Sequence, residues 1–414
     1  MESSQSTSQP STATHPDSAW QHKVHAFVAS SRQEILNDDD FNQNLKQALE
    51  AIKAGIQPIR IAAGSSGSYF VRNINYENIA IFKPKDEEPF APQNPKWPKY
   101  FQRMLCFCCF GRACLIPNNG YISETAASLV DEKLQLHIVP KTRVVRLASP
   151  AFYYKGGLRP DNREVKGKDG SYQLFLNGYV SASDIIPQWN KGGRLCPLTT
   201  IEIERFKYLF QKLCVLDYII RNTDRHMGNW LIKYEPGKVL ELAAIDNGLA
   251  FPVKHPETSS RLRQFPFAWA QLSWANYVRL ISSFCASLNR GELIFHELLL
   301  KCLHDIIIPW NEELRTYLLQ LLTPQFVQNL CDDIAILFKY DHDVNRFLKY
   351  SQLRVFRGQI WNLRLALMMK ESPAEMVKRP LVLVSRRYRR NPPDNDWNRA
   401  FRVKPADFGN RGCC

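Results

Sequence analysis

The fold of this chain is decided by Asp224-Arg225-His226-Met227-Gly228-Asn229-Trp230-Leu231, which is followed closely by Ala244-Ile245-Asp246-Asn247-Gly248. Apolar residues around the two stretches predict a short strand hairpin after a long helix. An aspartate, a histidine, an asparagine and a second aspartate would then surround this hairpin. Such a set could hold a divalent cation against nucleotide phosphates while a base takes a proton from a hydroxyl, as phosphoryl transfer requires. Taken alone, each stretch could equally be a polar turn beside a buried strand.

Each of these polar residues can be given a role in such a site. Asp224 could orient the acceptor hydroxyl and accept its proton, and His226 could share that proton or hold the leaving phosphate. Asn229 would supply a neutral oxygen and Asp246 an anionic one, and hard oxygen ligands suit Mg²⁺. The alternatives are a surface histidine at 226 and a turn aspartate at 246.

A Gly/Ser turn and a lysine farther upstream suggest the other half of a nucleotide site. Ser65, Ser66, Gly67 and Ser68 precede a predicted strand, and small residues let backbone N–H groups approach phosphate oxygens. Lys83 ends the next apolar strand, where it could offer a positive charge to the phosphates. The turn is neither a Walker loop nor the glycine-rich pattern of protein kinases. An ordinary turn and a solvated lysine are the alternatives.

The composition indicates a large folded chain with an anionic partner. Its 414 residues are 45% hydrophobic and 12% aromatic, which is ample for two lobes. The net charge of +14 favours a nucleotide, a nucleic acid or an acidic membrane face as partner. We expect no disulfides, because the eleven cysteines follow no signal peptide. We also expect no transmembrane helix, because the most apolar long segment, 293–309, contains five ionisable residues.

Periodicity predicts a smaller strand-rich front part and a helical back part, which is an α+β fold with a cleft between two lobes. Residues 1–25 are polar and expected to be disordered, and 376–414 form a basic tail with half of the net charge. The predicted helices are 27–56, 120–136, 201–220, 265–274, 312–340 and 344–369. The predicted strands are 69–72, 79–82, 139–147, 173–176, 229–234 and 239–245.

Several long motifs, in one order along the chain, resemble those of the type II phosphatidylinositol 4-kinases. The resemblance covers about residues 57 to 375. The matching motifs are Ser65–Val71, Ile81–Pro89, Asn94–Trp97, Gly120–Glu124, Leu216–Arg225, Ala244–Pro252 and Arg357–Ile360.

This resemblance implies a bilobed fold like that of protein kinases and phosphoinositide 3-kinases, within a catalytic domain at 26–375. The N-lobe would span about 57–176 and the C-lobe about 177–375. It also implies ATP as donor, Mg²⁺ or Mn²⁺ as cation, and the 4-hydroxyl of phosphatidylinositol as acceptor. By position, ATP would be bound by the phosphate loop Ser65–Ser68, by Lys83, and by an interlobe hinge formed by Gln173, Leu174, Phe175 and Leu176. Asp224 would be the catalytic aspartate, Asn229 and Asp246 would be the metal ligands, and Ala244–Gln264 would be the activation segment. The residues near the lipid headgroup would be Glu88, Pro89 and Phe90.

A cysteine cluster suggests attachment to a membrane. Cys106, Cys108 and Cys109 match the palmitoylation cluster of the family, and Trp97 nearby suits an interfacial position. The resemblance also gives interfacial contacts on the same face to Trp189, Phe265, Phe267 and Trp269, although all four could be ordinary core aromatics. It implies a peripheral, lipid-anchored protein on the cytoplasmic face of Golgi, endosomal or plasma membranes. A zinc site or buried thiols are the alternatives for the cluster, and a prenylated Cys413-Cys414 end is a further possibility.

The chain departs from the family pattern at three places. The family reads Asp-Arg-Gly-Asn-Asp-Asn where this chain has Asp224–Asn229. The cysteine cluster of this chain is shorter than that of the family and lacks its proline, and the segment 276–311 is longer here than in the family. A catalytically silent scaffold on the same fold and a protein kinase are the rival functions. The protein kinase is disfavoured because the chain lacks a His-Arg-Asp loop and an Asp-Phe-Gly triplet. No nucleic-acid partner is expected, since no known binding module accompanies the basic tail.

Overall fold

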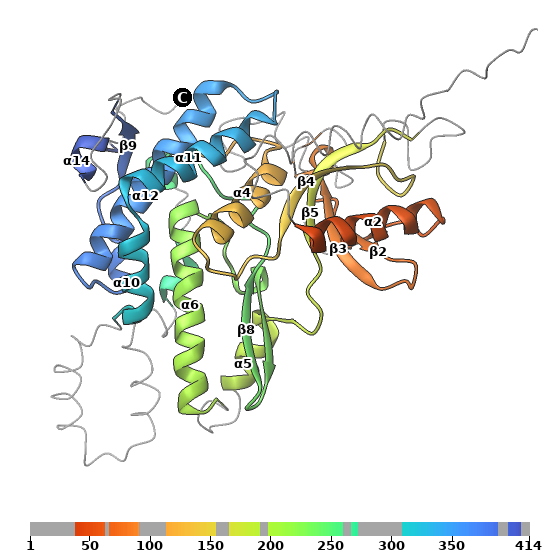
Figure 1. Cartoon of the computed structure of the whole chain (residues 1–414), viewed down its shortest axis with the longest axis horizontal. Coiled ribbons are helices and arrows are strands. Elements are labelled where there is room, and N and C mark those ends of the chain that lie inside the picture. Colours follow the sequence, from red (N-terminus) through yellow and green to blue (C-terminus); the bar gives the residue numbers. More distant parts are fainter. Residues whose placement is uncertain are drawn as a thin grey trace, which may run out of the picture.

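The chain folds into two lobes, one rich in strands and one rich in helices, which confirms the predicted bilobed α+β fold (Figure 1). The structure is a computed structural model. It describes residues 38–62, 66–89, 91, 113–154, 165–190, 198–259, 266–271, 309–387 and 396–406. The expected N-terminal disorder at 1–25 and most of the long segment 276–311 lie outside these ranges.

The first lobe is built on an antiparallel sheet of five strands in the order β1-β2-β3-β5-β4. Side chains alternate between the two faces of a strand, so a strand with alternating burial can cover a core with one face. On β2 and β3 the buried set includes Tyr69, Val71, Ala80 and Phe82. The strands are β1 (Ile59–Arg60), β2 (Tyr69–Arg72), β3 (Asn78–Pro84), β4 (Thr142–Leu147) and β5 (Lys168–Leu174).

Helix α2 (Asp39–Lys53) covers this sheet with an apolar stripe. Phe41, Leu45 and Ala48 lie at helical spacing and are buried, and the ring of Phe41 meets that of Tyr172 edge-on at 5.6 Å. The N-lobe therefore starts before residue 57, where the resemblance placed its beginning. The first residues of the predicted 27–56 helix lie outside the described ranges.

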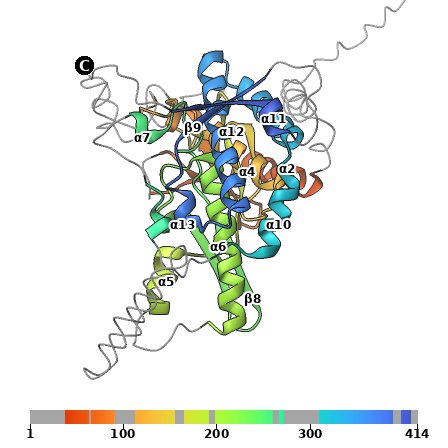
Figure 2. The same cartoon turned by 90° about the vertical axis from the view of Figure 1, so that its left-hand side faces the viewer.

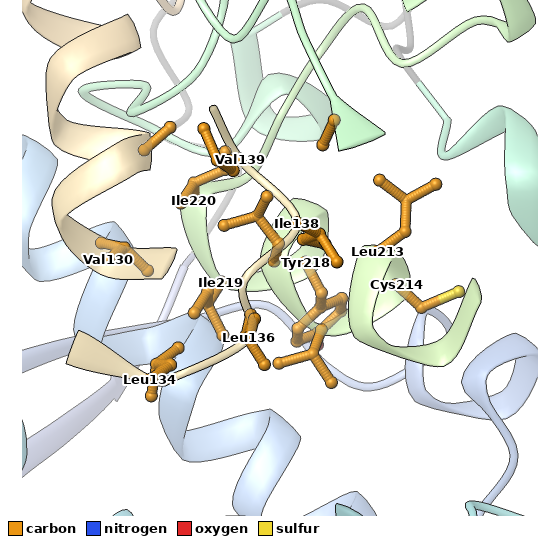
Figure 3. Close-up of a cluster of buried hydrophobic side chains, with 14 of the residues drawn as sticks. Val130, Leu134, Leu136, Ile138, Val139, Leu213, Cys214, Tyr218, Ile219 and Ile220 are labelled. Atoms are coloured by element: carbon orange, nitrogen blue, oxygen red, sulfur yellow. The ribbon is translucent and has the colours of Figure 1, made fainter. Parts of the chain in front are cut away.

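The second lobe is organised around the long helix α6 (Thr200–Ile220). A capping box between Thr199 and Glu202 opens this helix, and Arg221 ends it in a left-handed conformation with φ 48°. Figure 3 shows residues 213–220 packed against residues of α4 (Gly120–Lys133) and of the segment that follows it. Helix α4 is buried on nearly all sides because it lies between the two lobes. The labelled residues are Val130, Leu134, Leu136, Ile138, Val139, Leu213, Cys214, Tyr218, Ile219 and Ile220.

The rest of the lobe surrounds α6. A three-stranded sheet, β6-β7-β8, carries the predicted hairpin between α6 and the second polar stretch. These elements are β6 (Val180–Ser181), α5 (Ala182–Asn190), η3 (Met227–Asn229), β7 (Trp230–Glu235), β8 (Val239–Ala244), α7 (Pro256–Ser259), η4 (Ala268–Gln271), α10 (Glu312–Leu321), α11 (Pro324–Lys339), α12 (Arg346–Met368) and α13 (Pro373–Met376).

Part of the predicted basic tail is folded into the C-lobe, so the boundary expected at residue 375 is wrong. Strand β9 (Val382–Arg386) packs on α12 (Figure 2). It pairs with β10 (Phe401–Pro405), and α14 (Trp397–Ala400) lies between the two strands in the chain. Gly358 makes this crossing possible, because a Cβ there would lie 2.2 Å from the carbonyl oxygen of Val382. Val384 is fully buried and Trp397 is 5% exposed, so apolar residues bury this basic segment despite its charge.

Candidate active site

Lys83, near the end of β3, binds carboxylates from two distant parts of the chain. Its Nζ lies 2.5 Å from Oε1 of Glu124 on α4 and 3.0 Å from Oδ1 of Asp246. Burial alone would lower the pKa of Lys83, but the two carboxylates outweigh it and raise that pKa, so the ammonium stays charged. A lysine of this strand paired with a glutamate of the next helix is the arrangement that kinases need for nucleotide phosphates.

Glu124 also reaches the loop that carries Asp246. Its Oε2 accepts a hydrogen bond from the backbone N–H of Asn247 at 2.9 Å. Burial raises the pKa of Glu124, against the opposing charge of Lys83. The side chain of Asp246 is 55% exposed, and the charge of Lys83 lowers its pKa, so it is an accessible carboxylate at neutral pH. Asp246 has a left-handed backbone with φ 54°, an uncommon conformation for aspartate that is often found at functional sites.

The loop after α6 places Asp224 and Asn229 beside Asp246. The carbonyl oxygen of Asp224 accepts hydrogen bonds from the N–H of His226 at 2.9 Å and from Nδ2 of Asn229 at 2.8 Å. The N–H of Ile245, next to Asp246, donates to the carbonyl oxygen of Asn229 at 3.1 Å. The structure therefore brings together the three oxygen-bearing residues that the sequence singled out.

Arg225 fixes the relative position of these two loops. Its Nε lies 2.9 and 3.0 Å from the two carboxylate oxygens of Asp217 on α6. Its Nη1 donates to the carbonyl oxygens of Asn229 and Ile245, and its Nη2 donates to Oδ1 of Asn247. Burial raises the pKa of Asp217 to about 6, although the guanidinium beside it acts in the opposite direction. One buried cation thus joins α6, the Asp224 loop and the Asp246 loop.

His226 is exposed and makes a turn contact. Its Nδ1 accepts a hydrogen bond from the N–H of Gly228 at 3.1 Å, which requires a ring with Nδ1 unprotonated. This bond caps the short helix η3. His226 therefore has a structural role in addition to any role in proton transfer.

The Gly/Ser turn lies next to Lys83. Ser68 directly precedes Tyr69, whose partner in the sheet is Phe82, the residue before Lys83. The N–H of Gly67 donates to the carbonyl oxygen of Glu87 at 2.9 Å, and a Cβ at Gly67 would lie 2.3 Å from Oε2 of Glu87. The turn thus needs glycine at this position. Ser66 is described with it, whereas Ser65 lies outside the described ranges.

The predicted hinge connects the two sheets. After Leu174 the chain leaves β5 and enters β6 of the C-lobe sheet at Val180. The side chain of Gln173 is buried and donates to Oγ1 of Thr142 at 3.0 Å, and the N–H of Phe175 donates to the carbonyl oxygen of Ile79 at 3.0 Å. Gln173 therefore braces the sheet, and the strand ends at Leu174, two residues earlier than predicted.

The structure corrects the expectation that Glu88 meets the lipid headgroup. Its side chain is buried, and its carboxylate accepts hydrogen bonds from the N–H groups of Gly120 and Tyr121 at 3.0 and 2.7 Å. These bonds cap α4, so the carboxylate is engaged inside the protein. Pro89 is half-buried, and Phe90 lies outside the described residues.

The expected membrane contacts fall into two groups. Trp97, Cys106, Cys108 and Cys109 lie outside the described residues. The ring of Trp269 is 2% exposed and lies 5.0 Å from that of Phe267, so in this structure Trp269 is a core residue and its expected interfacial position is wrong. Within the described ranges, no helix combines the length and apolar character needed to cross a bilayer.

Four residues that organise the site have no role in the predictions made from the sequence. Glu124 and Asp217 are acidic residues inside largely apolar helical runs, and this pattern indicates a buried charge that needs a partner. Arg225 and Asn247 directly follow residues that were singled out, yet their contacts depend on the packing of α6 against β8. The pattern could have marked the two acidic residues, but it does not identify their partners.

Comparisons with known proteins agree with this geometry. The sequence pattern described as "Phosphatidylinositol 3- and 4-kinase" matches residues 64–284. Over 386 residues the chain is 39% identical to a phosphatidylinositol 4-kinase type 2-beta of Danio rerio, covering 84% of this chain and 70% of the relative. Over 388 residues it is 38% identical to a phosphatidylinositol 4-kinase type 2-alpha of Danio rerio, covering 85% of this chain and 78% of the relative.

A solved structure is also similar in part. The Helicobacter pylori proinflammatory kinase CtkA is 14% identical with a TM-score of 0.37, covering 75% of this chain and 94% of that one. The extent of identity to the two type 2 relatives confirms the resemblance read from the motifs. The chain therefore belongs to the phosphatidylinositol 3- and 4-kinase family.

Proposed function

We propose that this chain is a lipid kinase that transfers the γ-phosphate of ATP to the 4-hydroxyl of phosphatidylinositol. The observation that carries the proposal is the contact of Lys83 with both Glu124 and Asp246, beside the loop that holds Asp224 and Asn229. Relatives named phosphatidylinositol 4-kinase type 2 supply the substrate class. The presence of Lys83, Asp224, Asn229 and Asp246 argues against a silent scaffold.

Lys83 is the residue that receives the nucleotide phosphates. Its raised pKa keeps it cationic, and Glu124 holds it on the side of β3 that faces α4. The turn at Ser65–Ser68 offers backbone N–H groups and hydroxyls next to it, and the chain between Leu174 and Leu176 is the hinge that meets adenine. Charge and positioning are most of what phosphoryl transfer requires from a protein.

Asp246 and Asn229 fit a hard divalent cation. One is an accessible carboxylate, and the other is an amide whose Nδ2 already donates to Asp224, which leaves its Oδ1 as the ligand atom. Mg²⁺ is commonly held by one or two such side chains together with phosphate oxygens, and Mn²⁺ accepts the same donors. The bound cation supplies neutralisation of the charge that develops on the phosphates.

Asp224 orients the acceptor hydroxyl and takes its proton. Its backbone is held by Asn222, His226 and Asn229, so the position of the carboxylate is set before the lipid arrives. The acceptor is bilayer-borne, and we assign attachment to the cytoplasmic face of a membrane to acylated Cys106, Cys108 and Cys109, with Trp97 nearby in the sequence. Basic residues of the chain favour an acidic lipid surface.

The test is phosphate transfer from labelled ATP to phosphatidylinositol in detergent micelles, with the position of the new phosphate determined. The wild-type chain should give the 4-phosphate in the presence of Mg²⁺. Asp224→Asn should reduce kcat by at least about 10²-fold, whereas Asp40→Asn, a change at an exposed residue of α2, should not. Transfer to proteins but not to the lipid would overturn the proposal in favour of a protein kinase.

A further inference from the structure

We propose that Glu88 is a positioning residue: by capping α4 it holds Glu124 at the right distance and rotation to pair with Lys83. Its Oε1 accepts from the N–H of Tyr121 at 2.7 Å, and its Oε2 accepts from the N–H of Gly120 at 3.0 Å. The inference rests on the proposed function, because it concerns the geometry of the same nucleotide site.

Helix α4 depends on this distant cap. The residue at its own N-cap position, Asn119, makes no capping bond with its side chain, and the first turn contains no acidic residue. The first N–H groups of a helix have no partner within the helix, and a carboxylate beside them also complements the helix dipole. Glu88, 32 positions before Gly120, supplies both.

Gly120 allows the carboxylate to approach. A Cβ at this position would lie 3.0 Å from Oε2 and 3.1 Å from Cδ of Glu88, which is closer than ordinary van der Waals contact. The glycine at the start of α4 and the glutamate at the end of the β3 segment therefore fit each other. This is a second feature of the structure, separate from the hydrogen bonds, that points to a specific contact.

Two contacts join the same two segments. Lys83 and Glu88 lie on the segment that runs through η2 (Lys85–Glu87), and Gly120 and Glu124 lie one helical turn apart on α4. The Lys83–Glu124 pair attaches α4 to this segment at one point. The Glu88 cap attaches it at a second point one turn away, about 5.4 Å along the axis. Glu88 thereby fixes where the carboxylate of Glu124 is presented.

Lys85, between the two contacts, attaches this frame to the C-lobe. Its Nζ lies 2.9 Å from Oδ1 of Asp341 and 2.7 Å from Oδ2 of Asp343, which follow α11. The other oxygen of Asp341 accepts from Nδ2 of Asn119 at 3.4 Å. The start of α4 and the η2 segment are thus both held by one buried aspartate.

The charge state of Glu88 gives a readout that a purely structural role would not. Burial raises the pKa of Glu88 to about 7, while the two N–H groups lower it and the charges that face it are Glu124 and Lys85. The ionised carboxylate can accept both N–H bonds, and the protonated form loses acceptor capacity. Wild-type kcat should therefore fall as pH drops through about 7, and Glu88→Gln should lack this pH-dependent step.

The experiment compares full-length wild type, Glu88→Gln and the exposed control Glu204→Gln in the lipid kinase assay, with ATP binding measured by titration calorimetry. We expect kcat/KM for ATP to fall by on the order of 10²-fold in Glu88→Gln, a weaker Kd for Mg-ATP, an unchanged KM for lipid, and no effect in the control. If wild type is active and Glu88→Gln equals it in both measurements, the inference is overturned. If wild type does not phosphorylate the lipid, the proposed function fails, and the calorimetry still tests the position of Lys83.

A rescue variant separates positioning from helix stability. Asn119→Ser gives α4 a cap of its own, since serine is favoured at N-cap positions. In Glu88→Ala/Asn119→Ser we expect the Tm to recover toward that of wild type while kcat/KM stays low. Asn119→Ser alone also loses the bond from Nδ2 to Asp341, so its own Tm and kcat/KM are the reference values for the double variant. Recovery of activity together with the Tm would show that any cap suffices, and the positioning role would be wrong.

Discussion

Two cations, Lys83 and Arg225, organise the site, and they differ in how open their surroundings are. Lys83 is 19% exposed, and one of its partners, Asp246, has a side chain that is 55% exposed. Arg225 and Asp217 are 1% and 0% exposed. We call the contacts of Lys83 with Glu124 and Asp246 the open network, and those of Arg225 with Asp217, Asn229, Ile245 and Asn247 the closed network. The open network is accessible to a nucleotide and a cation, whereas the closed network has no room for either.

The difference indicates a division of labour. In the open network Asp246 can exchange Lys83 for a cation, because partly exposed ion pairs contribute little free energy and rearrange easily. In the closed network, breaking a buried pair leaves an uncompensated charge, which costs about 3–5 kcal/mol. The closed network thus keeps Asn229 and Asp246 next to each other while the open network changes partners.

The largest effect on activity is expected for Asp246→Asn. The variant keeps the size of the side chain and removes the anionic ligand, so kcat/KM should fall by at least about 10³-fold, or about 4 kcal/mol of transition-state stabilisation. Because the side chain is half exposed, the Tm should change little. A variant that is unfolded by circular dichroism would contradict the assignment of Asp246 to the open network.

Arg225→Met should have the largest effect on stability. It removes all contacts of the closed network and leaves the buried carboxylate of Asp217 without its cationic partner, so the free energy of unfolding should drop by about 3–5 kcal/mol. Urea denaturation measures this change. The double variant Arg225→Met/Asp217→Leu should recover part of the stability but not the activity. Full activity in the double variant would show that the closed network does not align the loops.

Gly358→Ala tests whether the packing of β9 on α12 supports the segment that follows Asp246. A Cβ there would meet the carbonyl oxygen of Val382, so the free energy of unfolding should drop by about 1–3 kcal/mol. The same oxygen lies 2.9 Å from Nε2 of His255, in the segment after Asp246. Activity per folded molecule should therefore fall as well. Ser351→Ala, on the same helix, serves as the control, and an equal Tm for both variants would contradict the packing of β9 on α12.

The smallest effect on activity is expected for Lys85→Met. This change removes the ion pairs with Asp341 and Asp343, of which the second carboxylate is 83% exposed. We expect a loss of about 1–3 kcal/mol, since buried Asp341 loses one partner, and a rise of a few-fold in the KM for ATP, since Lys85 lies between Lys83 and Glu88. Steady-state kinetics and thermal unfolding measure both effects. A change in kcat as large as that of Asp246→Asn would show that Lys85 belongs to the open network.

Local sequence signals predicted the elements well where one segment decides the outcome. Helix α6 follows from its apolar residues at helical spacing, and the hairpin of β7 and β8 follows from two short strands on either side of a turn. A predicted boundary is wrong where a single residue prevents pairing. The strand predicted at 139–147 begins at Thr142, because Pro140 cannot donate a ladder hydrogen bond.

The residues of the candidate site that lie in sequence motifs were predicted, whereas the contacts between distant parts of the chain were not. Asp224, Asn229 and Asp246 lie on loops whose polar residues are informative in themselves. Glu124 meets Lys83 across 41 positions of sequence, and nothing local to either residue specifies that pair. Glu88 and Trp269 were expected to be exposed and are buried, since no local pattern distinguishes an exposed polar or aromatic residue from one that the fold buries.

A crystal structure of the full chain with Mg²⁺ and a non-hydrolysable ATP analogue tests the central claim most directly. The account predicts that Asp246 and Asn229 bind the cation at roughly 2.0–2.1 Å, that Lys83 contacts a phosphate and keeps Glu124, and that every contact of Arg225 is unchanged. A cation bound elsewhere, with Asp246 still on Lys83, would contradict the account.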